Sequence, residues 1–266
     1  MNVDLNSIQD IPDSLLDKLA SHNDLFLQNN FSDSLSEHWK LAPLVSELNE
    51  YCLTNNVIGI HFTRSVKSSI LSKGLLSQSG SKFRDNFLES YSHLFTTEEL
   101  LEIKRRWLSY FGTTGCEERD FRIFFNFTDD ALRNGGADEL LGMFGGEQIT
   151  MCFDNDGDCS ISEKLSLIGE PLIVRCSIDP HRVETYIEQP WGKILMSAYH
   201  KHINPGACRI DQDGSVTYPI SKRDIVEIIT LTNCLRGIRN AWHFYYALVY
   251  VFKVACSSFG IALLTP

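Results

Sequence analysis

The chain has 266 residues and a mass of 30.2 kDa, and 43 % of its residues are hydrophobic. A chain of this length and composition buries a substantial core, which excludes wholesale disorder. It carries 24 Lys and Arg residues and 34 Asp and Glu residues, so its formal net charge is −10. That charge excludes a protein that coats nucleic acid nonspecifically, although it leaves room for a local basic cleft.

The N-terminal sequence has no basic stretch followed by an apolar one, so it predicts no signal peptide and a cytoplasmic location. Eight cysteines are present, and no two of them form a CxxC pair. Their surroundings predict buried, reduced thiols, and we expect no metal site.

Three regions follow one another along the chain. Residues 1–54 are polar, and their apolar residues recur at helical spacing, which predicts a small helical element. Residues 55–232 combine strand and helix patterns and form the expected core. Residues 233–266 form an apolar C-terminal segment.

The core opens on a strand, a short helix and a second extended piece. The sequence VIGIHFTR at residues 57–64 is typical of a strand. Ser65 can cap a helix that begins at Val66, and Gly74 ends that helix as a C′ glycine does. Leu75 begins the next extended piece.

Further elements of the core follow from apolar spacing and from capping residues. Helical patterns cover residues 96–112, where Thr96 or Thr97 is the cap, and residues 131–146 and 162–169. Strand patterns cover residues 121–127, 146–153, 171–179 and 223–232. Short strands outnumber helices in the second half, which predicts an α+β fold with a mixed, twisted sheet.

The C-terminal segment is unusually apolar. Residues 244–264 carry one charge, Lys253, near their middle. Their length suits a marginal membrane helix, but a central cation costs about 2.5–3.5 kcal/mol on insertion scales. We therefore favour a buried terminal helix or a pair of strands over a membrane span, and a surface for a protein partner comes next.

Two short motifs offer chemistry. His61 and Thr63 share one face of the first predicted strand, where an imidazole can bind a ribose hydroxyl and the strand backbone can pair with an amide. The alternative is a half-buried histidine held by a backbone carbonyl.

Gly145 and Gly146 precede Glu147, whose carboxylate can stabilise a developing cation or act as a base. The alternative is an exposed glutamate after a turn.

Together, the H-x-T-R strand end, the following helix with its Gly-Leu, and the G-G-E step resemble ADP-ribosyltransferase-fold proteins of bacterial toxin type over about residues 55–232. The resemblance implies an NAD-dependent transferase whose catalytic glutamate is Glu147. It implies that His61 binds the NAD ribose and that Thr63 supports the adenosine side. Gly74 and Leu75 complete the implied NAD-binding residues.

The resemblance also has departures. The residue two before Glu147 is Gly145, so the E-x-E pattern of arginine-modifying toxins is absent, and Glu227 on the last predicted strand is a rival for the glutamate role. The aromatic residue that stacks on nicotinamide is open among four candidates: Phe83, Tyr91, Tyr110 and Phe124.

The resemblance leaves the acceptor of ADP-ribose open among RNA, DNA and protein. It further implies a toxin–antitoxin or phage-defence role, with residues 233–266 as the surface for an antitoxin or chaperone. Two other functions stay open: a non-catalytic binding module on the same scaffold, and a metal-independent ribonuclease toxin that uses His61 with His200 or His202.

Two remaining motifs are weaker. Lys104, Arg105 and Arg106, next to Trp107, form a basic and aromatic patch that suits single-stranded nucleic acid, or else a solvated helix face. Residues 154–165 begin like an EF-hand loop, but Cys159 and Leu165 occupy the positions of the required Gly and Glu. The sequence therefore predicts an acidic turn there.

Overall fold

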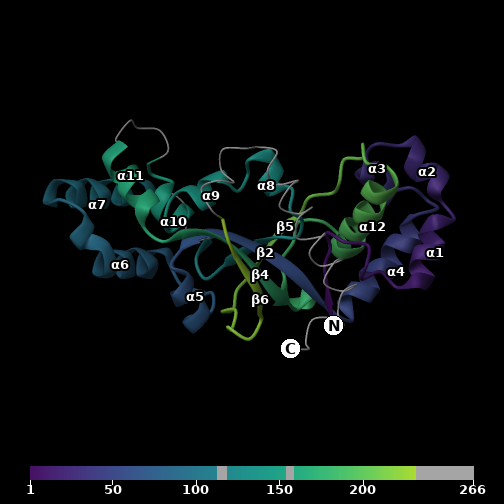
Figure 1. Ribbon diagram of the computed structural model, residues 1–266, viewed down its shortest axis with the longest axis horizontal. Helices are drawn as coiled ribbons and strands as arrows, with labels where there is room; N and C mark the ends of the chain where they lie inside the picture. The colour runs from purple at the N-terminus through teal and green to yellow at the C-terminus, as the bar shows by residue number, and fades with distance from the viewer. Residues whose placement is uncertain (113–118, 154–158, 232–266) are drawn as a thin grey trace, which may run out of the picture.

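A six-stranded sheet lies at the centre of the computed structural model, which describes residues 1–112, 119–153 and 159–231 (Figure 1). The strands are β1 (Asn2–Val3), β2 (Asn56–Ser65), β3 (Ile123–Asn126), β4 (Glu170–Ile178), β5 (Asp213–Val216) and β6 (Ile225–Thr230). Their order is β5-β3-β2-β4-β6, and β1 pairs with β2 in parallel, whereas every other pairing is antiparallel. The fold is therefore α+β with a mixed sheet, as the sequence predicts.

Helices gather at the two ends of the sheet and over part of one face (Figure 1). At one end lie α1 (Asp13–Ala20), α2 (Asn23–Gln28), α3 (Ser32–Ser36), α4 (Ala42–Leu53) and α12 (Pro190–Ile203). At the other end lie α6 (Gly80–Tyr91), α7 (Thr97–Phe111), α10 (Glu147–Thr150) and α11 (Cys159–Leu167). The remaining elements are α5 (Lys67–Lys73), α8 (Ala131–Asn134), α9 (Asp138–Gly142) and the 3-10 turns Ser92–Leu94 and Pro180–Arg182.

The two faces of the sheet bury different residues. The register pairs Val57 with Ile178 and His61 with Val174, so these side chains share the face that packs against α4 and α12. Ile60 and Phe62 point the other way, toward the residues of α8 and α9. A third apolar cluster, around Phe87, Trp107 and Ile149, holds α6, α7 and α10 together.

The helices of the N-terminal region share a core with the sheet. Leu44 and Leu48 of α4 lie in the same apolar cluster as Trp191 of α12 and Val57 of β2. A Cβ atom on Gly192 would lie 2.0 Å from the carbonyl oxygen of Val45, so this glycine allows α12 to approach α4 closely. Burial of these apolar side chains is the main force that holds this end together.

Several local predictions are confirmed. Residues 13–20 and 42–53 are helical, and β2, β4 and β6 lie where strands are expected. Thr96 caps α7, and Glu99 completes the capping box. Gly74 ends α5 with a φ of 77°, but Ser65 does not cap this helix, because its N-cap is Val66 without a side-chain bond.

Other predictions are wrong. The helix expected over residues 131–146 is two short helices, because Gly135 takes a left-handed φ of 86° between them. Residues 146–153 do not form a strand: Glu147–Thr150 is a helical turn, and Ile149 is buried in the cluster around Trp107. Alternation over so few residues cannot exclude a turn that tertiary packing favours.

Strand β3 is shorter than predicted. Ile123, Phe125 and Phe127 are buried as expected, but Phe121 has a positive φ and lies outside the strand. Residues 233–266, and residues 154–158 of the predicted acidic turn, lie outside the described residues. In the described part of the chain, no helix is long and apolar enough to cross a membrane.

Candidate functional site

One edge of β2 is paired in separate pieces. Its first residues pair with β1, and Ile60 then pairs with Asn126 of β3. Near the end of the strand, the Gly145 amide donates to the Arg64 carbonyl oxygen at 3.4 Å. Phe62 lies between these two attachments, and it has no register partner on this edge among the described residues. We call this stretch of β2 the open edge.

The backbone directions show what the open edge presents. The Phe127 amide donates to Gln212 toward β5, so alternate residues of β3, including Phe124, direct their backbone groups toward β2. Ile60, Phe62 and Arg64 likewise direct theirs toward β3 and Gly145. A regular ladder would therefore pair Phe62 with Phe124.

His61 replaces that pairing. Its Nδ1 lies 2.9 Å from the Phe124 carbonyl oxygen. The imidazole therefore bonds the carbonyl that the Phe62 amide would bond in a regular ladder. A carbonyl oxygen only accepts, so Nδ1 carries the proton and Nε2 of the neutral ring is an acceptor. Desolvation lowers the pKa of His61 despite the bond to Phe124, which favours the neutral ring. The carbonyl contact expected of a structural histidine is thus present, and it leaves Nε2 directed elsewhere.

The G-G-E step borders the other end of the open edge. Gly145 and Gly146 both have positive φ values, 90° and 54°, and a Cβ on Gly145 would lie 2.3 Å from Ile149. They turn the chain from its bond with Arg64 into α10, whose first residue is Glu147. The partly exposed Glu147 carboxylate forms an ion pair with Arg119, which lies just before β3. This ion pair joins the two sides of the open edge.

Arg64 fixes the end of β2. Its buried guanidinium donates to the carbonyl oxygens of Ile168 at 3.0 Å and Gly169 at 3.1 Å. Because its backbone oxygen also accepts from Gly145, Arg64 sets the position of the G-G-E step relative to β2.

The other predicted NAD-binding residues lie in different settings. Thr63 is partly exposed, and alternation places it on the same face of β2 as His61. Leu75 is buried and pairs with Ile220 through two backbone bonds. Gly74 lies against the same partner, because a Cβ there would be 2.0 Å from the Ile220 carbonyl oxygen.

The rival glutamate faces away from His61. In the sheet register, Val174 is opposite both His61 and Ile228, so Glu227 projects from the opposite face. Its carboxylate lies 3.8 Å from the Arg175 guanidinium. Glu147 and Glu227 therefore belong to different surroundings, and Glu147 is the one that borders the open edge.

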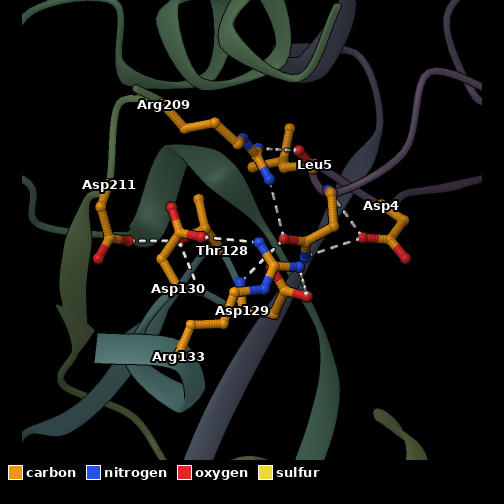
Figure 2. Close-up of polar contacts among 9 residues, drawn as sticks. Asp4, Leu5, Thr128, Asp129, Asp130, Arg133, Arg209 and Asp211 are labelled. Carbon is orange, nitrogen blue, oxygen red and sulfur yellow. Dashed lines mark hydrogen bonds and ion pairs between the residues drawn. The ribbon is translucent and has the colours of Figure 1, made fainter. Parts of the chain in front are cut away.

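A polar network joins Asp4 and Leu5 to Asp129, Arg133 and Arg209 (Figure 2). Arg175 bonds Asp4 at 2.6 Å, and the side chain of Asn6 accepts from the Asp129 amide at 2.9 Å and from Arg209 at 3.3 Å. Although burial alone would raise the pKa of Asp4, the Arg175 charge and the Asn6 bonds lower it. The network ties the N-terminal residues to the end of β3.

The described residues were also compared with the ligand sets of metal sites. No group of three or more His, Cys, Asp or Glu side chains arranged to hold a metal ion occurs in residues 1–112, 119–153 and 159–231. Cys52 and Cys176 are buried free thiols, and desolvation raises the pKa of each to about 12.

The predicted nucleic-acid patch on α7 is largely engaged within the fold. Arg105 and Arg106 both bond the Glu102 carboxylate, at distances between 2.6 and 2.7 Å. Trp107 is buried, and its indole donates to the Ile149 carbonyl oxygen at 3.1 Å, so its ring cannot stack on a base. Lys104 is exposed.

The histidine pair of the ribonuclease alternative does not share a site with His61. His200 is fully buried, where Nδ1 bonds Ser32 at 2.8 Å and Nε2 bonds the carbonyl oxygens of Phe26 and Asn29 at 3.0 Å. It fastens α12 to the α2–α3 region and has no access to a substrate. His202 is exposed.

Among the candidate stacking aromatics, Phe124 is the one at the open edge. Phe124 is 36 % exposed and its carbonyl oxygen accepts the His61 bond, but its side chain shares the face of Phe62, opposite His61. Phe83 and Tyr91 pack against the Phe87 cluster, and Tyr110 packs against Phe111.

Comparison of the chain with protein-family models, curated proteins and solved structures gave no match.

Proposed function

We propose that the chain is an NAD-dependent ADP-ribosyltransferase whose substrate binds at the open edge of β2. One observation carries the proposal: His61 displaces the Phe62 pairing at one end of this edge, and the G-G-E step reattaches at the other. The Phe62 amide and carbonyl match the acceptor and donor of a carboxamide such as that of nicotinamide. Nε2 of His61 is an acceptor for a ribose hydroxyl.

The proposed reaction breaks the bond between the ribose C1′ and the nicotinamide nitrogen. The bonding electron pair leaves with nicotinamide, and the ribose develops positive charge that the Glu147 carboxylate stabilises. A nucleophilic oxygen or nitrogen of the acceptor then bonds to C1′ and loses its proton to solvent or to that carboxylate. Catalysis in this scheme relies on holding NAD and the acceptor in line.

Arg119 belongs to the same proposal as a positioning residue. Its ion pair with Glu147 holds the carboxylate beside β3. Thr63, on the face of His61, is available to the adenosine side. The side chain of Phe124 lies on the opposite face, with that of Phe62, so it is not assigned to nicotinamide stacking.

The test is a pair of matched glutamate variants incubated with labelled NAD and separate pools of protein, DNA and RNA. We expect Glu147→Gln to abolish transfer while NAD still binds, because the amide keeps the shape and loses the charge. Glu227→Gln is the control, since this residue lies on the opposite sheet face. A fully active Glu147→Gln enzyme, or loss of transfer in Glu227→Gln alone, would overturn the assignment.

The same assay identifies the acceptor, because the pool that retains the label contains the molecule that received ADP-ribose. Absence of NAD consumption by the wild-type chain would favour a non-catalytic binding module on the same scaffold. The toxin–antitoxin or phage-defence role, with residues 233–266 as the partner surface, is part of this proposal, and co-purification of full-length and truncated chains with a candidate partner tests it.

A further inference from the structure

Phe121 has a backbone conformation that bulky residues rarely adopt. Its φ is 59°, and the other non-glycine residue with positive φ in the described residues is Gln189, which leads into Pro190 of α12. For an aromatic residue this left-handed conformation is strained, whereas Gly or Asn adopts it more easily. Sequence alternation alone places Phe121 on the buried strand face and does not predict this conformation.

Three hydrogen bonds from residues 77–80 hold this conformation. The Phe121 amide donates to the Gln78 carbonyl oxygen at 3.0 Å, and the Ser77 hydroxyl donates to the Phe121 carbonyl oxygen at 2.7 Å. The neighbouring Asp120 carboxylate accepts from the Gly80 amide at 2.8 Å. None of these bonds involves the phenyl ring, so the fold needs this backbone and not this side chain.

Phe121 is 55 % exposed. Both the strained backbone and the exposed apolar side chain disfavour folding. Strained positions of this kind cluster at functional sites. Phe121 also lies on the β3 side of the open edge, three residues before Phe124 and two after Arg119. Presenting this ring beside the proposed site therefore lowers the stability of the fold.

Its neighbours indicate the kind of ligand. Arg119 and Asp120 precede Phe121 and Arg122 follows it, and Arg122 is paired with Glu184 and bonded to Ser215. A single ring among charged side chains is not an apolar patch for a protein partner. A lone aromatic flanked by cations is instead suited to stacking on a flat heterocycle.

We infer that Phe121 is a stacking platform for a nucleobase, supplied either by the adenine of NAD or by a base of a single-stranded nucleic-acid acceptor. This inference deepens the proposed function and rests on it only for the dinucleotide source. Every base has a flat face that can stack on a phenyl ring, so the ring binds nucleobases without preferring one. The position of the ring then decides whether NAD or the acceptor supplies the base.

The test compares Phe121→Gly, Phe121→Leu and Phe121→Tyr in titrations with NAD, with AMP and with a short single-stranded RNA. Gly and Leu variants should weaken binding about fivefold or more, while Tyr should keep the wild-type affinity. Loss with NAD and AMP identifies adenine as the source, and loss with RNA alone identifies the acceptor base. Phe31→Leu is the control, because Phe31 is also exposed but has an ordinary φ of −115°.

A second measurement separates strain from general damage. Phe121→Gly relieves the positive φ, so we expect its thermal midpoint to rise by about 2–4 °C while its affinity falls. Unchanged affinity of both Gly and Leu variants for all three probes would overturn the inference, as would equal losses in Phe31→Leu. If the wild-type chain binds AMP through Phe121 but consumes no NAD, the proposed function fails and the nucleobase platform stands.

Discussion

The imidazole of His61 donates to the carbonyl oxygen of Phe124 across a distance of 2.9 Å, in place of the backbone amide of Phe62. One side chain thereby stops the β2–β3 ladder after a single register pair, Ile60 with Asn126. The same bond fixes the proton on Nδ1 and leaves Nε2 as an acceptor. His61 thus leaves the edge of β2 unpaired and also supplies it with a hydrogen-bond acceptor, Nε2.

His61→Asn separates these two roles. The Asn amide can still donate to Phe124, but it offers no acceptor at the position of Nε2. We expect near-wild-type stability and a loss of NAD affinity of about fivefold or more, measured by calorimetry. His61→Ala should lose the affinity and also about 1–3 kcal/mol of unfolding free energy, because the Phe124 carbonyl loses its donor. Wild-type affinity in His61→Asn would remove His61 from the ribose contact.

The pH dependence follows from the same residue. Desolvation holds the pKa of folded His61 below its ordinary value of 6.5, so below that pH the unfolded chain binds a proton that the folded chain resists. The stability contribution of His61 is therefore complete above about pH 6.5 and is lost as the pH falls through the folded pKa. Thermal unfolding at pH 7.5 and pH 5.5 should show a larger drop for wild type than for His61→Asn. Parallel drops would contradict the assignment.

Gly74 tests the attachment of the helix end to the segment around Ile220. Gly74→Ala puts a Cβ 2.0 Å from the Ile220 carbonyl oxygen and strains a φ of 77°, so we expect a loss of about 1–3 kcal/mol or more. Gly142→Ala is the matched control, because nothing lies within 4 Å of its new Cβ. Urea unfolding measures both, and equal midpoints in the two variants would show that the close contact is not important.

Asn6 tests the polar network that joins the N-terminal residues to the end of β3 (Figure 2). Asn6→Ala removes the acceptor of the Asp129 amide and one partner of Arg209, so about 1–3 kcal/mol of unfolding free energy should be lost. Asn134→Ala removes one exposed bond, to the Gly136 amide, and should cost less than about 0.5 kcal/mol. A smaller loss for Asn6→Ala than for Asn134→Ala would show that the network adds no stability.

Local sequence patterns predict the elements whose signals lie within a few residues. Thr96 and Glu99 form their capping box inside one helical turn, and Gly74 ends α5 through its own backbone freedom. Periodicity likewise identified β2, β4 and β6 and the α+β class. These features need no knowledge of distant partners, because the hydrogen bonds or the apolar spacing that specify them are local.

The arrangement of the candidate site depends on contacts between segments that are distant in the sequence. The register of β2, β4 and β6, which strand patterns do not specify, places Glu227 on the sheet face opposite His61. The bond from Gly145 to Arg64 places Glu147 at the open edge. The helical turn at Glu147 depends on Trp107 and its apolar neighbours, and the left-handed Phe121 depends on bonds from residues 77–80. The residues that set each of these features lie about 40 or more positions away along the chain. Their influence arises only when folding brings the segments together, so short-range patterns carry no trace of it.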